Sequence, residues 1–182
     1  MAGRKNEDRL RNAIEENCLD VMLLQQPLIG EDLRFVSGSF RIVSDLTHID
    51  GMTRDIAFLV EEIPGKAAKK LVAEFTEMAE CAASMVEQAG AAFAAADVEG
   101  AQRVVERDSR VNELYDEVEG KLVELIRAGK SSAQYLPELL MVAKYFERIG
   151  DLAKRVAAWA IFRVTGEHVV AEKASQQRPT EG

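Results

Sequence analysis

The sequence contains few of the residues on which several common kinds of site depend. Two cysteines, two histidines and four prolines occur among 182 residues. Cys18 and Cys81 are too few for a disulfide framework and fit reduced core positions. Two histidines make a Ser/His/Asp or Cys/His catalytic arrangement implausible, and no glycine-rich loop follows a strand to bind phosphate. The usual catalytic motifs are therefore not expected.

Long apolar segments and basic stripes are also missing. No apolar run approaches the ~20 residues that span a bilayer, and the first residues, MAGRKNEDRL, lack the apolar core of a signal sequence. The net charge of −8 provides no stripe to neutralise nucleic-acid phosphates. We therefore expect a cytoplasmic protein that binds no nucleic acid and does not insert into a membrane, being at most peripheral through its partners.

What the sequence has in abundance is helix-forming residues. Hydrophobic residues make up 47% and charged residues 30%, a globular mix rich in Ala, Leu, Glu, Lys and Val. We predict an all-α protein of five long helices. The first three are expected from Glu7 to Gln25, from Asp32 to Glu62 and from Ala67 to Ala96. The fourth is expected to run from an N-cap at Asp97 to a C-cap at Gly129. The fifth is expected to begin either at a capping box formed by Ser131 and Gln134 or at Pro137.

Each predicted helix carries an apolar stripe at intervals of three, four or seven residues. Helices of ~20 to 30 residues joined by short turns pack antiparallel, which predicts a helical bundle. The stripes are Leu10, Ile14, Cys18 (or Val21) and Leu24; Phe35, Ile42, Ile49 and Ile56; Leu71, Phe75, Met78, Ala82, Met85, Ala89 and Phe93; Val104, Val111, Val118 and Leu125 with Leu114 and Leu122; and Tyr135, Val142, Ile149 and Val156 with Leu139, Phe146, Ala153 and Ala160.

An internal repeat relates the two halves of the chain. DLTHIDGMTRDIAFLV (45–60) matches YFERIGDLAKRVAAWA (145–160) through Ile, a basic residue and a β-branched residue followed by Ala, and LRNAIE (10–15) matches LYDEVE (114–119). A duplication implies two three-helix units, the first lacking its opening helix. We predict a truncated first repeat over 1–64, a three-helix bundle over 65–166 and a flexible tail over 167–182.

The acids of the second copy allow two interpretations. Glu147 and Asp151 lie one helical turn apart, with Lys154 and Arg155 three and four residues beyond Asp151. One interpretation is a solvated face with local ion pairs. The other is a site for a hard cation with oxygen ligands.

The fourth helix offers completing ligands to the second interpretation. Asp108 and Asn112 lie on one flank of its apolar stripe and face the fifth helix if the two pack antiparallel. A di-iron site of the ferritin kind needs Glu-x-x-His pairs. His48 stands alone with Asp45, and His168 lies in the tail, so that site is disfavoured.

Two longer phrases resemble a known family. IEENCLDVMLLQQPLIGEDLRFV and YFERIGDLAKRVA are similar to PhoU, the accessory regulator of bacterial phosphate uptake, over about Asp8 to Gly166. The resemblance implies two tandem three-helix bundles, often dimeric, with surface metal (iron, manganese, magnesium or zinc) at Glu/Asp-x-x-x-Asp motifs. It places metal at Glu147 and Asp151, with Asp108 and Asn112 in the family's second acidic pair.

The first repeat departs from this pattern. Thr47 and Gly51 stand where the family has Glu and Asp, and Arg4 stands where another acid is expected. Asp8 and Asp50 would hold a cation weakly, or that face is purely structural. Without an opening helix, the apolar faces of the first two helices have too little to pack against, which predicts a homodimer formed through this half or marks a shortened chain.

The function implied by the resemblance is non-enzymatic regulation. The chain would contact the ATPase of the phosphate importer and the phosphate-sensing histidine kinase, reduce uptake and regulon expression when phosphate is plentiful, and be tuned by metal. Two alternatives stay open: a helical protein–protein interaction module without a phosphate role, and a carboxylate-bridged metal protein or metalloenzyme.

Overall fold

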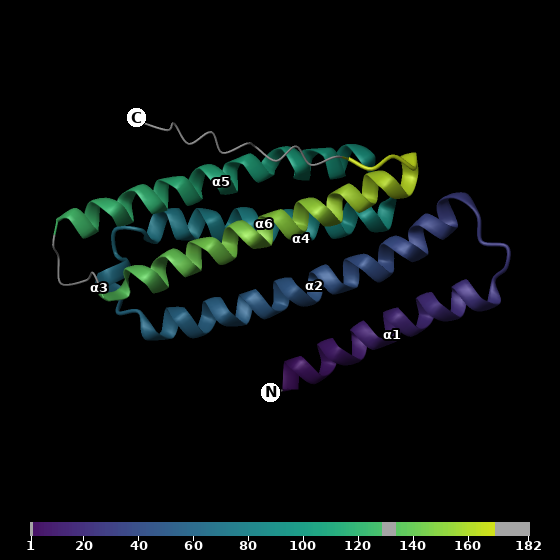
Figure 1. Ribbon diagram of the computed structural model, residues 1–182, viewed down its shortest axis with the longest axis horizontal. Coiled ribbons are helices and arrows are strands. Elements are labelled where there is room, and N and C mark those ends of the chain that lie inside the picture. Colours follow the sequence, from purple (N-terminus) through teal and green to yellow (C-terminus); the bar gives the residue numbers. More distant parts are fainter. Residues whose placement is uncertain (1, 129–133, 170–182) are drawn as a thin grey trace, which may run out of the picture.

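The chain folds into long helices that lie side by side (Figure 1). The structure, a computed structural model, describes residues 2–128 and 134–169, with side chains from residue 5 onward. Its elements are α1 (Ala2–Leu24), α2 (Gly30–Glu62), α3 (Gly65–Ala68), α4 (Val72–Ala95), α5 (Val98–Arg127) and α6 (Leu136–Thr165). The described residues contain no strand, so the all-α prediction is confirmed.

Local signals placed most helix ends correctly. The Asp97 side chain accepts a hydrogen bond from the Gly100 amide at 2.9 Å, as its predicted N-cap role requires. Helix α6 begins at Leu136 with Pro137 in its first turn, so the proline start is confirmed. The alternative capping box at Ser131 and the predicted C-cap at Gly129 lie outside the described residues.

The predicted helix from Ala67 to Ala96 is wrong in one respect, because the chain breaks it near the start. The short helix α3 ends at Ala68, and α4 starts only at Val72. Between them Leu71 leaves helical geometry, with φ −118° and ψ 1°, and its side chain is completely buried. Leu71 belongs to the core cluster, and its amide and carbonyl remain hydrogen-bonded, to Ala68 and Phe75, across the break.

The core lies between α4, α5 and α6. The apolar stripes predicted for these helices meet there, and the largest fully buried side chains are Leu71, Met78, Met85, Leu114, Leu139, Val104, Val111, Val118 and Val156. Alanines such as Ala89, Ala153 and Ala160 are also fully buried, so the helices can approach closely. Cys18 and Cys81 are free thiols, as expected.

Helices α1 and α2 add a thinner layer. Helix α2 packs along α6, whereas α1 packs substantially only on α2 and lies at the edge of the molecule (Figure 1). Of the stripe predicted for the first helix, Cys18 is buried, but Leu10 and Leu24 are exposed. The division into repeats at residue 64 stays a prediction, and the predicted tail is described only as far as residue 169.

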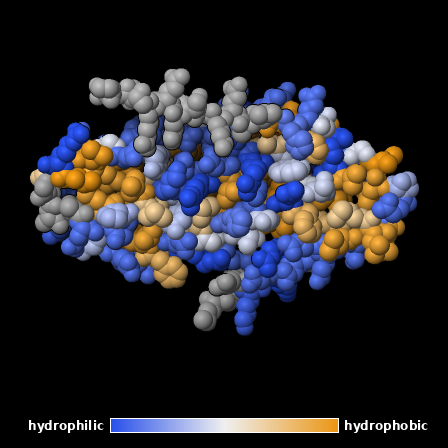
Figure 2. Space-filling view, viewed as in Figure 1, coloured by the Kyte–Doolittle hydropathy of each residue, from blue (hydrophilic) through white to orange (hydrophobic). Residues whose placement is uncertain are grey.

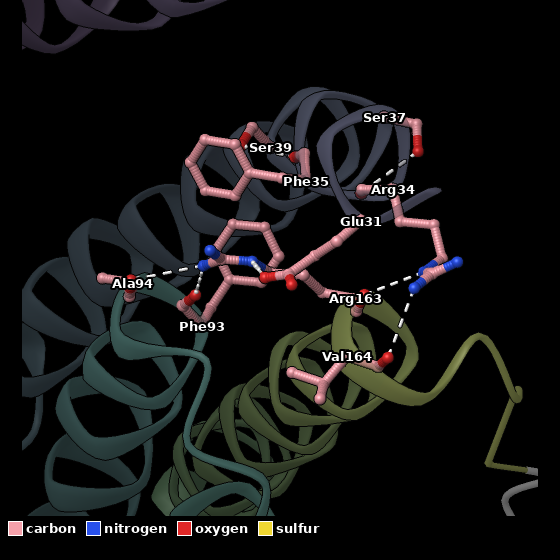
Figure 3. A network of polar contacts seen from close by, with 9 residues as sticks. All are labelled: Glu31, Arg34, Phe35, Ser37, Ser39, Phe93, Ala94, Arg163 and Val164. Atoms are coloured by element: carbon pink, nitrogen blue, oxygen red, sulfur yellow. Dashed lines mark hydrogen bonds and ion pairs between the residues drawn. The ribbon is translucent and has the colours of Figure 1, made fainter. Parts of the chain in front are cut away.

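Arg163 ties the start of α2 to the ends of α4 and α6 (Figure 3). Its guanidinium pairs with Glu31 at 3.2 Å, donates to the carbonyl oxygen of Phe93, and lies 4.3 Å from the ring centre of Phe35. Arg34 in turn donates to the carbonyl oxygen of Arg163 at 2.8 Å. The GEDLR segment (30–34) therefore anchors the start of α2 to its neighbours. Arg34 binds carbonyl oxygens at the end of α6, and Arg163 binds carbonyl oxygens at the end of α4.

Candidate functional site

The structure brings the predicted acids of α5 and α6 into one cluster. Asp108 of α5 is buried at the interface with α6, where it accepts hydrogen bonds from Lys154 Nζ at 2.7 Å and from Asn112 Nδ2 at 3.4 Å. Glu147 and Asp151 lie close enough to influence each other and Asp108 electrostatically. We call Asp108, Glu147 and Asp151 the acidic cluster.

A glycine of α6 makes room for this cluster. Gly150 is buried, and a Cβ atom on it would lie 3.4 Å from Val111 Cγ1 and 3.6 Å from Asp108 Oδ1. The absence of a side chain at this position lets α5 approach α6 closely while the Asp108 carboxylate remains alongside. Glycine between Glu147 and Asp151 thus has a packing role at the site.

Two lysines neutralise part of the cluster's charge. Lys154 reaches Asp108 from α6, and Lys144 donates to Glu147 Oε1 at 2.8 Å. The remaining oxygens, Asp108 Oδ1 and Glu147 Oε2, are buried and have no hydrogen-bond partner among the described residues. Buried carboxylate oxygens are normally satisfied, so a cation or water bound here would gain hydrogen-bonding or ligand oxygens that are otherwise unused.

Asp151 lies at the solvent-exposed rim of the cluster. Surrounding protein atoms partly desolvate its carboxyl group, which raises the pKa of that group. The negative charges of Glu147 and Asp108 raise the same pKa further. Lys154 and Lys144 oppose this effect only in part. The rim is therefore locally negative despite the two lysines, which favours an incoming cation.

Lys144 and Glu147 form a local ion pair on α6, but the local pairs considered for Asp151 with Lys154 and Arg155 are not found among the described residues. Lys154 pairs with Asp108 of α5 rather than with Asp151, and Arg155 pairs with Asp45 of α2. Arg155 Nε donates to Asp45 Oδ2 at 2.8 Å, and a second hydrogen bond makes the contact bidentate. Asp45 is 5% exposed, so this ion pair fastens α6 to α2 through a buried carboxylate.

The donor set of the acidic cluster is suited to a hard cation. Carboxylate oxygens are the preferred ligands of Mg²⁺, Mn²⁺ and iron. Among the described residues, however, no three His, Cys, Asp or Glu side chains are already arranged to hold a metal. A cation would have to draw the carboxylates together and displace the ammonium groups from them.

The histidines do not contribute to this cluster. His168 stacks on Phe162 with ring centroids 4.0 Å apart, and His48 is exposed on α2. A Glu-x-x-His site of the di-iron kind therefore has no histidine at the acidic cluster.

The pair of acids suggested in the first repeat is arranged differently from the prediction. Asp50 pairs with Arg54, which also binds Glu7 at 2.8 Å, and the Asp50 pKa is raised by burial and by Glu7. Asp8 turns instead toward Arg11, at 3.9 Å. Glu7 is the carboxylate that the sequence prediction missed, and Arg54 already occupies the place between it and Asp50.

Arg54 and Lys154 occupy equivalent positions of the two repeats, 100 residues apart. Each extends from the last helix of its unit to a carboxylate on the preceding helix, Glu7 or Asp108. The side chain of Arg4, where the family pattern expects an acid, lies outside the described side chains. A basic side chain thus links neighbouring helices in both places, and in both places the carboxylates outnumber the basic groups by one.

None of the helices in the described part of the chain combines the length and apolar character needed to cross a membrane.

Comparison with known proteins yields one family. Residues 75–160 match the family model described as PhoU domain. The chain is 30% identical over 162 residues to a "Phosphate-specific transport system accessory protein PhoU homolog" of Clostridium acetobutylicum, covering 89% of this chain and 74% of that protein. It is 34% identical over 166 residues to the homolog of the same name from Aquifex aeolicus, covering 89% and 73%.

A solved structure shares the fold. The crystal structure of the phosphate transport system regulatory protein PhoU from Streptococcus pneumoniae superposes with a TM-score of 0.80. The alignment covers 91% of this chain and 77% of that one at 21% identity. The similarity between the two structures supports the helical architecture and nothing further.

Proposed function

This chain belongs to the PhoU family, and we propose on that basis that it is a non-enzymatic regulator of phosphate transport. Its curated relatives are named accessory proteins of the phosphate-specific transport system, which supports a regulatory role related to phosphate. The finer part of the proposal is the mechanism. In the cytoplasm, the chain contacts the importer ATPase and the phosphate-sensing histidine kinase, and reduces uptake and regulon expression when phosphate is plentiful.

The observation that supports metal modulation is the acidic cluster between α5 and α6. Within the part of the chain that the structure describes, two of its oxygens, Asp108 Oδ1 and Glu147 Oε2, are buried without hydrogen-bond partners, and Asp151 stands at the open rim. When bound, a divalent or ferric ion would supply positive charge that neutralises the cluster. Asp108, Glu147 and Asp151 would hold it, with the Asn112 amide oxygen as a further ligand.

The lysines set the conditions under which the ion binds. Lys154 and Lys144 already compensate one oxygen each of Asp108 and Glu147. A cation gains affinity from the carboxylates only after it has displaced these ammonium groups, so binding is weaker than the number of acids suggests. The displaced lysines would then extend to solvent, and the metal would change the charge pattern that a partner protein meets on α5 and α6.

The regulatory role is tested by deleting the gene in its host and assaying a phosphate-regulon reporter in phosphate-rich medium. We expect expression to rise when the chain is absent and to fall again when it is restored. In parallel, the purified chain should capture the importer ATPase and the sensor kinase in pull-down experiments. Unchanged reporter expression together with no binding to either partner would favour a helical interaction module without a phosphate role.

The metal site is tested with the double variant Glu147→Gln, Asp151→Asn. We expect it to lose most of the bound Mn²⁺ or iron measured by elemental analysis after dialysis, with its helical circular dichroism unchanged. A matched control is Glu113→Gln with Glu117→Gln, an i,i+4 acid pair that lies exposed on α5 beside Arg110. Equal metal content in both variants would remove the acidic cluster as the site.

A further inference from the structure

One arginine of the first repeat lies between two carboxylates that come from neighbouring helices. Arg54 of α2 pairs through Nη1 with Glu7 of α1 at 2.8 Å, and through Nη2 with Asp50, one helical turn earlier on α2. The two acids also affect each other, because burial raises the pKa of the Asp50 carboxyl group and the nearby Glu7 raises it further. We call Glu7, Asp50 and Arg54 the Arg54 clamp.

The acidic cluster of the second repeat holds its basic groups differently. Lys154 donates to one oxygen of Asp108, and Lys144 donates to one oxygen of Glu147. In the described part of the chain, the other oxygen of each of these acids is buried without a hydrogen-bond partner. In the Arg54 clamp a single guanidinium contacts both acids, and neither acid has a buried, unpartnered oxygen among the described residues. The cluster therefore has unused ligand oxygens, whereas the clamp has its cation already in place.

Burial is not what protects the acids of the Arg54 clamp from metal ions. The side chains of Arg54, Glu7 and Asp50 are 39%, 46% and 32% exposed. Figure 2 shows that hydrophilic surface gathers over the middle of the molecule, where α1 begins in Figure 1, and apolar surface toward the two ends. An ion from solvent can therefore reach these acids, and what it meets between them is a guanidinium.

A guanidinium is harder to displace from such a place than an ammonium. It is charged at every physiological pH and presents planar donors that can serve two carboxylates at once. The hydrogen bond to Glu7 and the charge of Asp50 raise the pKa of Arg54 still further. A metal ion would have to break both contacts together, and the displaced charge would stay tethered beside it. Each lysine of the acidic cluster, in contrast, has to leave only one acid.

The internal repeat shows that the position of the base is shared and the position of its partner is not. Arg54 and Lys154 are equivalent, 100 residues apart, but in the alignment of α1 with α5 Glu7 is equivalent to Val111. The two links between helices are thus built from different acids. Because α1 packs substantially only on α2, the Arg54 clamp also holds α1 in place.

We propose that Arg54 takes the place of a metal ion in the first repeat, so that the chain has one exchangeable cation site, the acidic cluster, and not two. The charges between α1 and α2 then stay the same whatever the metal supply, and only the surface of α5 and α6 responds to metal. The role of the acidic cluster rests on the proposed function, whereas the role of Arg54 follows from the clamp alone.

The test is Arg54→Gln in a chain that also carries Glu147→Gln and Asp151→Asn. The last two changes disable the acidic cluster, so the first repeat is observed by itself. Arg54→Gln removes the guanidinium and adds an amide oxygen, a ligand for hard cations, beside two carboxylates. After equilibrium dialysis against about 1 mM Mn²⁺, elemental analysis should find about one more Mn²⁺ per chain than in the double variant. No gain in Mn²⁺ overturns the proposal.

Matched variants show whether the gain belongs to the Arg54 clamp. Adding Glu7→Gln and Asp50→Asn to the triple variant should abolish the gain. Arg41→Gln in the same background, which removes an exposed arginine of the same helix, should give none. A gain that survives the loss of both acids, or that appears with Arg41→Gln, overturns the proposal.

A conservative variant guards against loss of folding, which circular dichroism monitors throughout. Arg54→Lys in the same background keeps a positive charge but makes it displaceable from the acids. It should also gain Mn²⁺, with a midpoint about tenfold higher than that of Arg54→Gln. Arg54→Lys without any gain overturns the proposal.

The wild-type chain separates this proposal from the proposed function. It should bind about one Mn²⁺ under the same conditions, and about two would overturn the proposal, because Arg54 would then exclude nothing. A wild-type chain without bound Mn²⁺ would contradict metal binding at the acidic cluster. The gain in the triple variant would still decide the role of Arg54.

Discussion

Replacing Lys154 by methionine tests how the acidic cluster is balanced. The substitution keeps the aliphatic length of the side chain and removes the ammonium group that donates to Asp108 Oδ2 at 2.7 Å. Asp108 then keeps one weak donor, Asn112 Nδ2 at 3.4 Å. The variant therefore isolates the contribution of one charge to a buried carboxylate.

The magnitude follows from burial. The side chain of Asp108 is 4% exposed, and breaking a fully buried ion pair by removing one partner costs about 3–5 kcal/mol. The side chain of Lys154 is 27% exposed, so water can approach the carboxylate once the ammonium is gone, and we expect a smaller loss of about 2–3 kcal/mol. For a chain of this size, that loss lowers Tm by about 4–12 °C.

Metal binding should respond in the opposite direction. A cation entering the variant no longer has to displace the ammonium from Asp108. We expect the midpoint of a Mn²⁺ titration, followed by the rise in Tm, to fall about tenfold, which corresponds to about 1.4 kcal/mol. Thermal unfolding followed by circular dichroism, with and without Mn²⁺, measures both effects on the same samples.

The control is Arg148→Met, which removes a positive charge from an exposed position on the same helix and should change Tm by less than about 2 °C. Lys154→Met with Asp108→Asn should recover much of the lost stability, because no buried charge is left unpaired. A Lys154→Met protein with wild-type Tm and a wild-type response to Mn²⁺ would refute the assigned role of Lys154.

Two further predictions concern packing and pH. A Cβ on Gly38 would lie 3.0 Å from Phe93 Cε2, so Gly38→Ala should lower the free energy of unfolding by about 1–2 kcal/mol. A Cβ on Gly90 would meet nothing within 4 Å, so Gly90→Ala should raise the free energy of unfolding by about 0.5–1 kcal/mol. Urea unfolding that gives the reverse order of stability would contradict this prediction. Hydrogen bonding by Lys121 lowers the pKa of Glu74. The resulting stabilisation is present above the ordinary pKa of a glutamate and is lost as pH falls through the lowered value, so Lys121→Met should destabilise the protein more at neutral pH than at pH ~3. If Lys121→Met lowers the stability equally at both pH values, the Lys121–Glu74 pair is not the source of the stabilisation.

Local chemistry made most of the fold predictable. The side chain of Asp97 caps α5 through a contact three residues away, and Pro137 starts α6 because its missing N–H costs nothing in a first turn. The break before Val72 was not predictable in this way. The chain around Leu71 has ordinary helix-forming residues, and the break is visible only in the backbone geometry of the folded chain.

The partners of the charged residues were much harder to predict. The sequence alone suggests that Lys154 and Arg155 pair with an acid one helical turn away, which is Asp151. The fold instead presents buried carboxylates of two other helices, Asp108 and Asp45, to them. On α1, the side chains of the neighbouring residues Glu7 and Asp8 point about 100° apart. The packing of α1 on α2 turns Glu7, and not Asp8, toward Arg54.

The sequence by itself determined the helices, their order, the repeat and the family, because capping residues, apolar periodicity and short phrases act over a few residues. Only the tertiary structure decided which oxygens of the acidic cluster are left without partners, since that depends on how α5 approaches α6 at Gly150. It also decided that Leu10 and Ile14 remain exposed while Leu114 and Val118 are buried. A side chain's burial is set by the helix that packs against it, and equal stripes in two repeats do not guarantee equal neighbours.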